Sequence, residues 1–289
     1  MFGPNTYFKD DVEIKFSHRD QIFFDLFERV NELFTEKFNL QDYDILFIPG
    51  SGTIGIEAMM FSMDYKINFI GNDGTFRDRL IQLYKNYEKE KSRTNKVDMF
   101  VHLETSISKP FDNGKGECLV DAISAFPYYD IPKGTKVFIT CLNKQIGSYI
   151  GLSVVGVRRD QWKYCKDEKV FSYLNLKRYV AYLAQNQTPH TTPTFIYEHL
   201  YKVLTTFNIE RHREKIDTVS KLICDNVPYE MIIGDHRCPV ITVNKYAFTD
   251  EVAKKYDLYG YWTGKPCYQF FTYTQPIQDY IDFFQAIKK

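Results

Sequence analysis

The feature that most constrains the fold is a series of short, continuous apolar runs, each of which ends in polar residues. Between residues 43 and 142 these runs are YDILFIP, KINFIGND, DMFVHLET, ECLVDAIS and TKVFITCL. Continuous apolar runs are typical of strands that are buried on both faces, as in parallel sheets. Helical or loop stretches separate the runs. This alternation predicts an α/β fold with a mostly parallel sheet, in which the carboxyl ends of the strands carry the functional site.

Helical patterns flank this series on both sides. Apolar residues recur every three or four positions from Gln21 to Lys37, which predicts a helix before the first strand. After a further β-rich run, IGLSVVGVRRD, the segment QTPHTTPT is interpreted as a hinge or ordered loop. Helical patterns and the apolar segments MIIGDHRCPVITVNKY and CYQFFTYT follow it. We therefore expect a large domain over residues 1–190 and a smaller C-terminal α+β domain over residues 191–289.

Composition narrows the class of partner. The 289 residues include 37 basic and 37 acidic side chains, so the chain has no net charge that would attract nucleic acid or an anionic membrane. No apolar run approaches the roughly 20 residues of a membrane span, and the N-terminus lacks the pattern of a signal peptide. The 6 cysteines are scattered without the spacing of a metal site. We expect a cytoplasmic protein with reduced thiols, a small-molecule partner and no metal, nucleic-acid or membrane partner.

A glycine-rich turn follows the first apolar run. Residues 50–55 read Gly-Ser-Gly-Thr-Ile-Gly, and Asp73 follows about twenty positions later, so the segment meets the requirements of a dinucleotide fingerprint. A glycine turn at a helix N-terminus nevertheless presents backbone N–H groups and a positive dipole end to any anion. The turn alone therefore leaves a nucleotide, the phosphate of another cofactor and a simple tight turn as alternatives.

Polar residues at the ends of the predicted strands form the list of candidate site residues. They are Ser51, Asn72, Asp73, Glu104, Thr105, Asp121, Asn143 and Lys144. A dinucleotide enzyme or a methyltransferase has no particular use for a lysine at this position. A pyridoxal phosphate enzyme uses a lysine to form a Schiff base and an aspartate to keep the pyridine nitrogen protonated. Asp121 alone could be a helix N-cap and Lys144 alone a solvated lysine, but their order on successive strands favours the cofactor.

These segments resemble the class V group of fold-type I pyridoxal phosphate aminotransferases. PGSGTIGIEAM, HLETS, LVDAISAF and TCLNKQIGSYIGLSVV are most similar to segments of 2-aminoethylphosphonate:pyruvate transaminases. FSHRD, KQIGSYIGLSVVGVRRD and TTPTFIYEHLYKVL are similar to segments of phosphoserine aminotransferases. The resemblance extends from Phe16 to about Leu204 and implies pyridoxal 5'-phosphate as the cofactor.

The resemblance assigns a role to several residues. Lys144 would form the Schiff base and move the proton, and Asp121 would pair with the pyridinium nitrogen. Phe76 would stack on the cofactor ring and Thr105 would contact the ring hydroxyl. Asn143, directly before the lysine, belongs to the same cofactor-binding set.

The cofactor phosphate is the second part of the implied site. Ser51, Gly52 and Thr53 would hold the phosphate, so the glycine turn would bind a phosphate and not a dinucleotide. Thr191 or Thr192 would reach the phosphate of a neighbouring subunit. The resemblance therefore implies a homodimer with shared active sites.

One departure concerns the substrate. Members of the family place an arginine late in the small domain as a bidentate fork for the substrate carboxylate, and this chain has Gln269 there. Arg19, Arg237 and Arg77 are candidates to replace it. We expect simple α-amino acids to be poor donors. A compound with a terminal amino group, or with a phosphonate or phosphate, is expected to be preferred.

Four functions therefore stay open from the sequence. The first is an aminotransferase that acts on a small amino compound, such as one resembling 2-aminoethylphosphonate, with a keto acid or aldehyde partner. The second is a lyase or decarboxylase with the same cofactor. The third is a Rossmann-type nucleotide- or S-adenosylmethionine-binding protein that uses Asp73. The last is an inactive scaffold, which the presence of both Lys144 and Asp121 disfavours.

Overall fold

The centre of the molecule is a six-stranded sheet with the order β1-β8-β7-β6-β3-β2. The computed structural model describes residues 16–91, 94–114, 116–166 and 170–288. The strands of the sheet are β1 (Tyr43–Pro49), β2 (Lys66–Phe69), β3 (Lys96–Val101), β6 (Cys118–Asp121), β7 (Thr135–Cys141) and β8 (Leu152–Arg158). β2, β3, β6 and β7 are parallel, while β8 runs antiparallel to both β7 and β1. The predicted mostly parallel α/β sheet is confirmed.

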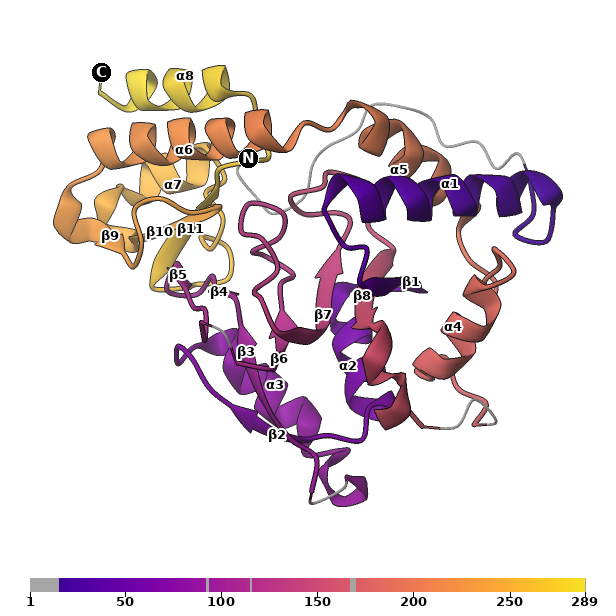
Figure 1. Ribbon diagram of the computed structural model, residues 1–289. Coiled ribbons are helices and arrows are strands. Elements are labelled where there is room, and N and C mark those ends of the chain that lie inside the picture. The colour runs from indigo at the N-terminus through magenta and orange to yellow at the C-terminus, as the bar shows by residue number, and fades with distance from the viewer. Residues whose placement is uncertain (1–15, 92–93, 115, 167–169, 289) are drawn as a thin grey trace.

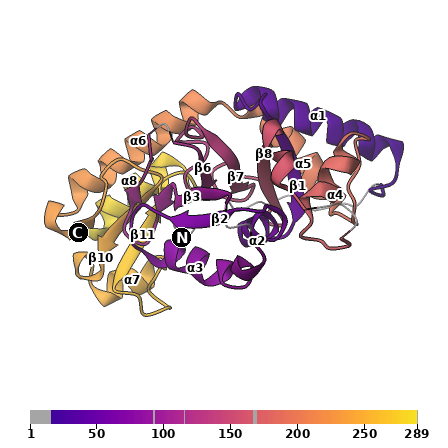
Figure 2. The same ribbon diagram turned by 60° about the horizontal axis from the view of Figure 1, so that its bottom comes forward.

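Helices cover both faces of this sheet, because successive strand residues point to opposite faces and both sets are apolar. Phe138 packs in the cluster that holds α1 (Gln21–Lys37) and α5 (Thr194–Thr206). Its neighbour Ile139 packs in the cluster that holds α2 (Gly52–Ser62), α3 (Thr75–Tyr84) and α4 (Leu176–Leu183). Figure 2 shows α1 and α5 on one side of the sheet and α2 and α3 on the other.

The C-terminal elements form a smaller α+β unit around a second core. It contains α6 (Ile209–Asn226), β9 (Ile232–Ile233), β10 (Val240–Asn244), α7 (Asp250–Lys255), β11 (Cys267–Phe271) and α8 (Ile277–Ile287). The three strands are antiparallel, in the order β11-β10-β9. Figure 1 shows this unit at one side of the large sheet, beside the short pair β4 (Leu103–Glu104) and β5 (Lys109–Pro110).

The two units are not independent. Leu103 and Ala125, which follow β3 and β6, are buried in the core of the C-terminal unit. Conversely, α5 lies within the residues that we assigned to the small domain, yet it packs against α1 in the core of the large sheet. The predicted domain boundary between residues 190 and 191 stays a prediction.

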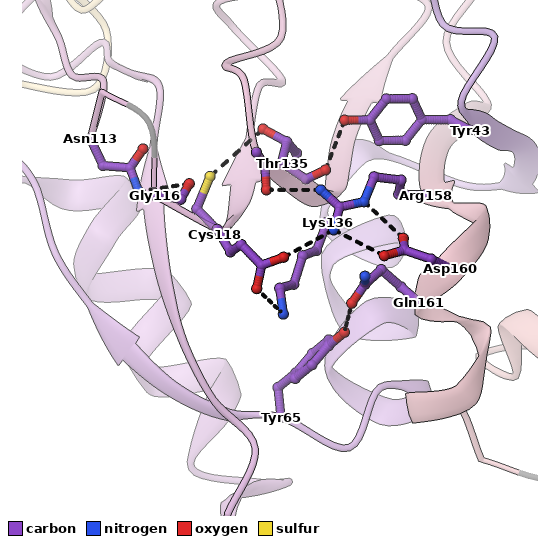
Figure 3. A network of polar contacts seen from close by, with 12 residues as sticks. Tyr43, Tyr65, Asn113, Gly116, Cys118, Thr135, Lys136, Arg158, Asp160 and Gln161 are labelled. Atoms are coloured by element: carbon purple, nitrogen blue, oxygen red, sulfur yellow. Dashed lines mark hydrogen bonds and ion pairs between the residues drawn. The ribbon is translucent and has the colours of Figure 1, made fainter.

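A charged network lies at the amino ends of the parallel strands, on the opposite side of the sheet from their carboxyl ends. Lys136 and Arg158 both pair with Glu117, at 2.8 and 3.1 Å, and Arg158 also pairs with Asp160 at 2.8 Å. Tyr43 Oη donates to the backbone carbonyl of Thr135 in the same region (Figure 3). The charged groups at the amino ends of the strands are therefore paired with one another. The functional site is expected at the carboxyl ends, as in other α/β sheets.

The helices and the polar side chains of the described residues bear on the class of protein. None of their helices combines the length and the apolar character that crossing a membrane requires. No group of at least three potential metal ligands comes together among them.

Candidate active site

A pocket lies at the carboxyl ends of the parallel strands, between the turn before α2, the first turns of α3 and the loop after β7. It brings together seven of the residues that the sequence predicts as site residues: Ser51, Gly52, Thr53, Phe76, Asp121, Asn143 and Lys144. These residues come from four separate segments of the chain. Residues at the ends of separate strands thus come together in one concave pocket.

The glycine turn has a backbone that requires glycine at two points. Gly50 has φ +133°, and its N–H donates to Gly151 O at 2.8 Å. At Gly52 an added Cβ would lie 2.6 Å from Cδ1 of Ile123, so glycine lets α2 approach the end of β6. The turn places the N-terminus of α2 at the pocket, where free N–H groups and the helix dipole favour a bound phosphate.

The position of β1 argues against a dinucleotide at this turn. In a Rossmann sheet the strand before the glycine turn lies in the middle, between parallel neighbours. Here β1 stands at one end of the strand order, paired with the antiparallel β8. Asp73, the residue expected to bind a ribose, forms an ion pair with Arg77 and its side chain is 92% exposed.

Asp121 is the buried carboxylate of the pocket. It ends β6, and its Oδ1 accepts a hydrogen bond from the N–H of Ile123 at 3.0 Å. Burial raises the pKa of Asp121 to about 6, against smaller opposing effects of the Ile123 hydrogen bond and of the positive charges of Lys144 and Arg79. A protonated nitrogen placed in the pocket would stabilise the charged carboxylate. Asp121 thus fits the pyridine nitrogen of pyridoxal phosphate.

Lys144 enters the pocket from the loop after β7. Its Nζ donates to Ser124 Oγ at 2.8 Å and lies 5.9 Å from the centroid of the Phe76 ring. The next residue, Gln145, is buried, and its Nε2 donates to Ser124 O at 2.6 Å. Gln145 Oε1 accepts from the N–H of Tyr128 at 3.1 Å. Gln145 therefore fixes the backbone of Ser124, and the hydroxyl of Ser124 accepts the hydrogen bond from the Lys144 amine.

The same loop is tied to the C-terminal unit through α6. His212 Nε2 lies 3.1 Å from Gln145 Oε1, and Tyr128 Oη donates to Asp217 Oδ1 at 2.6 Å. Burial lowers the pKa of His212 to about 4, assisted by the charges of nearby basic residues. A neutral His212 is therefore the donor to Gln145 near neutral pH. A series of polar contacts through Ser124, Gln145 and His212 therefore links Lys144 to the C-terminal unit.

The ring of Phe76 is positioned by a buried carboxylate. Glu104 Oε2 accepts from the N–H groups of Phe76 and Arg77, each at 3.1 Å, at the N-terminus of α3. Glu104 is fully buried, and a Cβ at Gly74 would collide with its carboxyl group. A carboxylate at this end of a helix is favoured by the helix dipole. Glu104, a strand-end residue, therefore fixes the backbone at Phe76, the residue predicted to stack on the cofactor, instead of lining the pocket.

Thr105 and Gln269, two predicted site residues, do not line the pocket. The Thr105 carbonyl accepts from Thr242 Oγ1 at 3.0 Å and from the Gln269 amide. Gln269 is only 7% exposed, and its Nε2 also lies 3.4 Å from Thr242 Oγ1. Its amide therefore joins β11 to the segment after β4.

The arginines proposed as substitutes also lie outside the pocket. Arg19 is exposed and donates to Thr188 O at 3.1 Å. Arg77 pairs with Asp73, and Arg237 forms a two-point ion pair with Asp217. None of the three is free to replace the missing arginine in this arrangement.

The threonines of the loop before α5 are likewise away from the pocket of their own chain. Thr191 is exposed, while Thr192 is 5% exposed and its Oγ1 lies 3.5 Å from Tyr197 Oη. The predicted contact with a neighbouring subunit concerns an assembly that a single chain does not contain, and it stays a prediction.

Arg79 is a pocket residue that the sequence analysis missed. It lines the pocket, and its guanidinium carbon lies 5.6 Å from the centroid of the Phe76 ring. The available signal was its spacing, because residues three apart share a face of a helix and Phe76 was already assigned to the site.

Comparisons with known proteins support the fold. No model of a protein family matches the chain, and no curated protein matches its sequence. Solved structures do match. An aspartate aminotransferase of subgroup IV from Thermus thermophilus gives a TM-score of 0.81 at 15% identity, with 99% of this chain and 97% of that chain covered.

Two further structures give similar values. A phosphoserine aminotransferase from Cytophaga hutchinsonii has a TM-score of 0.76 at 15% identity, covering 94% of this chain and 90% of that one. An alanine–glyoxylate aminotransferase from Nostoc sp. has a TM-score of 0.75 at 15% identity, covering 96% and 90%. The chain therefore has the fold of these aminotransferases, with a large, mostly parallel sheet and a smaller C-terminal unit.

Proposed function

We propose that this protein is a pyridoxal phosphate-dependent aminotransferase. The observation that carries the proposal is the convergence of the Lys144 amine, the buried Asp121 carboxylate, the Phe76 ring and the N-terminus of α2 on one pocket. Each of these groups matches a different part of the cofactor: the aldehyde, the ring nitrogen, the ring face and the phosphate. The similarity in fold to solved aminotransferases supports the same conclusion.

Each residue of the pocket has a distinct proposed role. The backbone of Ser51, Gly52 and Thr53 binds the phosphate, and Asp121 holds a proton on the ring nitrogen. Pyridoxal phosphate supplies an electron sink for charge that develops on the substrate carbon. Lys144 then moves a proton at that carbon, with its amine oriented by the Ser124 hydroxyl.

The proposed substrate is a small amino compound with an anionic group, such as a phosphonate or phosphate, and the acceptor is a keto acid or aldehyde. The similar structures include phosphoserine, alanine–glyoxylate and ureidoglycine–glyoxylate aminotransferases. The engagement of Gln269 with the Thr105 carbonyl leaves it without contact with the pocket, which supports a substrate that does not need the usual carboxylate fork. Membership of class V and a homodimer with shared sites, which would join Thr191 or Thr192 to the neighbour's phosphate, belong to the same proposal.

The first test asks whether Lys144 is the anchoring lysine. Borohydride treatment of protein loaded with pyridoxal phosphate should fix the cofactor to the peptide that contains Lys144, as read by mass spectrometry. Lys144→Ala should fold normally and fix none. Lys133→Ala, an exposed lysine just before β7, is the matched control and should behave like the wild type. Cofactor fixed to another lysine would refute the assignment.

A second measurement separates transamination from the alternatives. In an aminotransferase, a donor alone is consumed only once per protein, and its nitrogen stays with the protein until an acceptor carbonyl is added. A decarboxylase would release carbon dioxide in repeated turnover without an acceptor, and a lyase would likewise turn over on the donor alone. Binding of S-adenosylmethionine or a dinucleotide, with no binding of pyridoxal phosphate, would favour the Rossmann alternative.

A further inference from the structure

Arg79 is an exposed residue of α3 that lines the pocket. It does so together with Ser51, Thr53 and Phe76, and its guanidinium lies against the Phe76 ring. Within the described part of the chain, its guanidinium makes no hydrogen bond or ion pair, whereas Arg77, two residues earlier, is engaged by Asp73 and by the carbonyl of Phe69. An arginine held beside a pocket without a counter-ion has all its N–H donors available to a ligand.

The charges that line the pocket favour an anionic occupant. Among the described residues that line the pocket, Lys144 and Arg79 contribute positive charge and Asp121 contributes the only carboxylate. The free N–H groups at the N-terminus of α2 add to the positive side. Arg79 is near enough to Asp121 to lower its pKa, but its effect is smaller than that of Lys144. No ion pair or hydrogen bond joins Arg79 to Asp121 within the described residues, so the guanidinium keeps its capacity for another anion.

We propose that Arg79 is the oxyanion-binding side chain of this pocket, where it forms charge-assisted hydrogen bonds with the phosphate, phosphonate or carboxylate of the bound molecule. The proposal rests on the proposed function, because it assigns the anion of that site. A guanidinium suits this role since its planar fork matches the geometry of such groups. It also accounts for an anionic substrate in a chain whose Gln269 is turned to the Thr105 carbonyl.

The first experiment uses cofactor-free protein, so that its outcome does not depend on the proposed function. Inorganic phosphate and methylphosphonate are titrated against the thermal midpoint of the wild type, Arg79→Gln and Arg79→Lys. Arg79→Gln should bind these anions roughly ten- to a hundredfold more weakly, and Arg79→Lys should recover part of the loss because it keeps the charge but not the fork. Arg237→Gln, an exposed arginine paired with Asp217 outside the pocket, is the control. Equal binding by the wild type and Arg79→Gln would overturn the proposal.

Two further measurements distinguish whether Arg79 binds the anion of the cofactor or that of the substrate. The affinities of pyridoxal 5'-phosphate and of pyridoxal are compared in each variant, and a selective loss for the phosphorylated form assigns Arg79 to the cofactor phosphate. Loaded protein is then titrated with 2-aminoethylphosphonate, β-alanine and ethylamine, and followed by its visible spectrum. A selective loss for the two anionic amines assigns Arg79 to the substrate.

A loss of anion binding in the cofactor-free protein, with no selective loss in either of these measurements, would overturn the proposal and leave Arg79 as a surface contact for anions. Failure of every variant and of the wild type to bind pyridoxal phosphate would instead refute the proposed function. The phosphate titration would still decide whether Arg79 binds an oxyanion.

Discussion

At the scale of single residues, Asp121 combines a proposed chemical role with a cost in stability. Burial raises its pKa from 3.8 to about 6 in the cofactor-free protein, so the folded state holds a proton more tightly than the unfolded state does. For a raised pKa, the stabilising contribution is complete below pH 3.8 and is lost as the pH rises through 6. Above that range the folded protein contains a buried charge without a full partner, which costs at most roughly 3 kcal/mol.

Asp121→Asn should therefore be more stable than the wild type at pH 8, by about 1–3 kcal/mol, when no cofactor is present. The two proteins should have the same stability near pH 4, because the wild-type carboxyl is then neutral. Denaturant unfolding at a series of pH values measures the difference. The same variant should bind pyridoxal phosphate more weakly than the wild type does. A variant that is less stable at pH 8 would contradict this account of Asp121.

Sequence reasoning finds residues such as Asp121 and Lys144 because the ends of parallel strands meet at one edge of a sheet. It did not find Arg79. The three-residue spacing from Phe76 places both residues on one face of a helix, but whether that face meets the pocket depends on how the helix is packed. The direction of the Gln269 side chain depends on strand register. Gln269 lies opposite Thr242 in the β10–β11 pair, and this pairing, which only the folded chain reveals, turns its amide towards Thr105.

At the scale of elements, α3 is the clearest example of a helix placed by one buried contact. Glu104 accepts from two N–H groups in its first turn and lies against Gly74. Glu104→Gln removes the charge but keeps the shape, and one side of the new amide would donate where an acceptor is needed. We expect a loss of about 1–3 kcal/mol in the free energy of unfolding and weaker cofactor binding, because Phe76 is no longer held.

Asp78→Asn is the matched control for this prediction, since Asp78 is an exposed acidic residue in the same first turn. It should change the stability by no more than about 0.5 kcal/mol. Denaturant unfolding and titration with pyridoxal phosphate measure both variants. An equally small effect of Glu104→Gln would mean that α3 is held by its apolar contacts alone.

Most of the regular elements were predictable because their apolar patterns are strong. The runs that we identified became β1, β2, β3, β6 and β7, and the helix over 21–37 has the predicted bounds. The direction of β8 could not be predicted, because a fully buried strand shows the same apolar run whether it is parallel or antiparallel. The packing of α5 on α1 could not be predicted for a similar reason, since an apolar stripe does not indicate which surface covers it.

At the scale of the whole molecule, polar contacts connect the pocket to the C-terminal unit, and exposed apolar side chains lie at the pocket and near the loop before α5. The polar contacts through Gln145 and His212 link the lysine loop to α6 in the C-terminal unit. Ile150 lines the pocket and is 59% exposed. Near the loop before α5, Phe171 and Tyr173 are 74% and 54% exposed, and Tyr173 stacks on His190. Large exposed apolar side chains around a loop suit a surface that a partner covers.

The proposed homodimer can be tested by mixing inactive subunits. If Thr191 or Thr192 completes the phosphate site of the neighbour, a site needs Lys144 from one chain and these threonines from the other. Lys144→Ala and a Thr191→Val, Thr192→Val double variant should each bind cofactor poorly or fail to anchor it. Hybrid dimers contain one site with both defects and one site with neither. Unfolding and refolding the two together should restore borohydride-stable cofactor at one of the two sites of each hybrid.

Because Thr192 is buried beside Tyr197, the single Thr191→Val variant is needed as a control for folding. No restoration in a verified hybrid, or full cofactor binding by a monomer, would show that each chain builds its phosphate site alone.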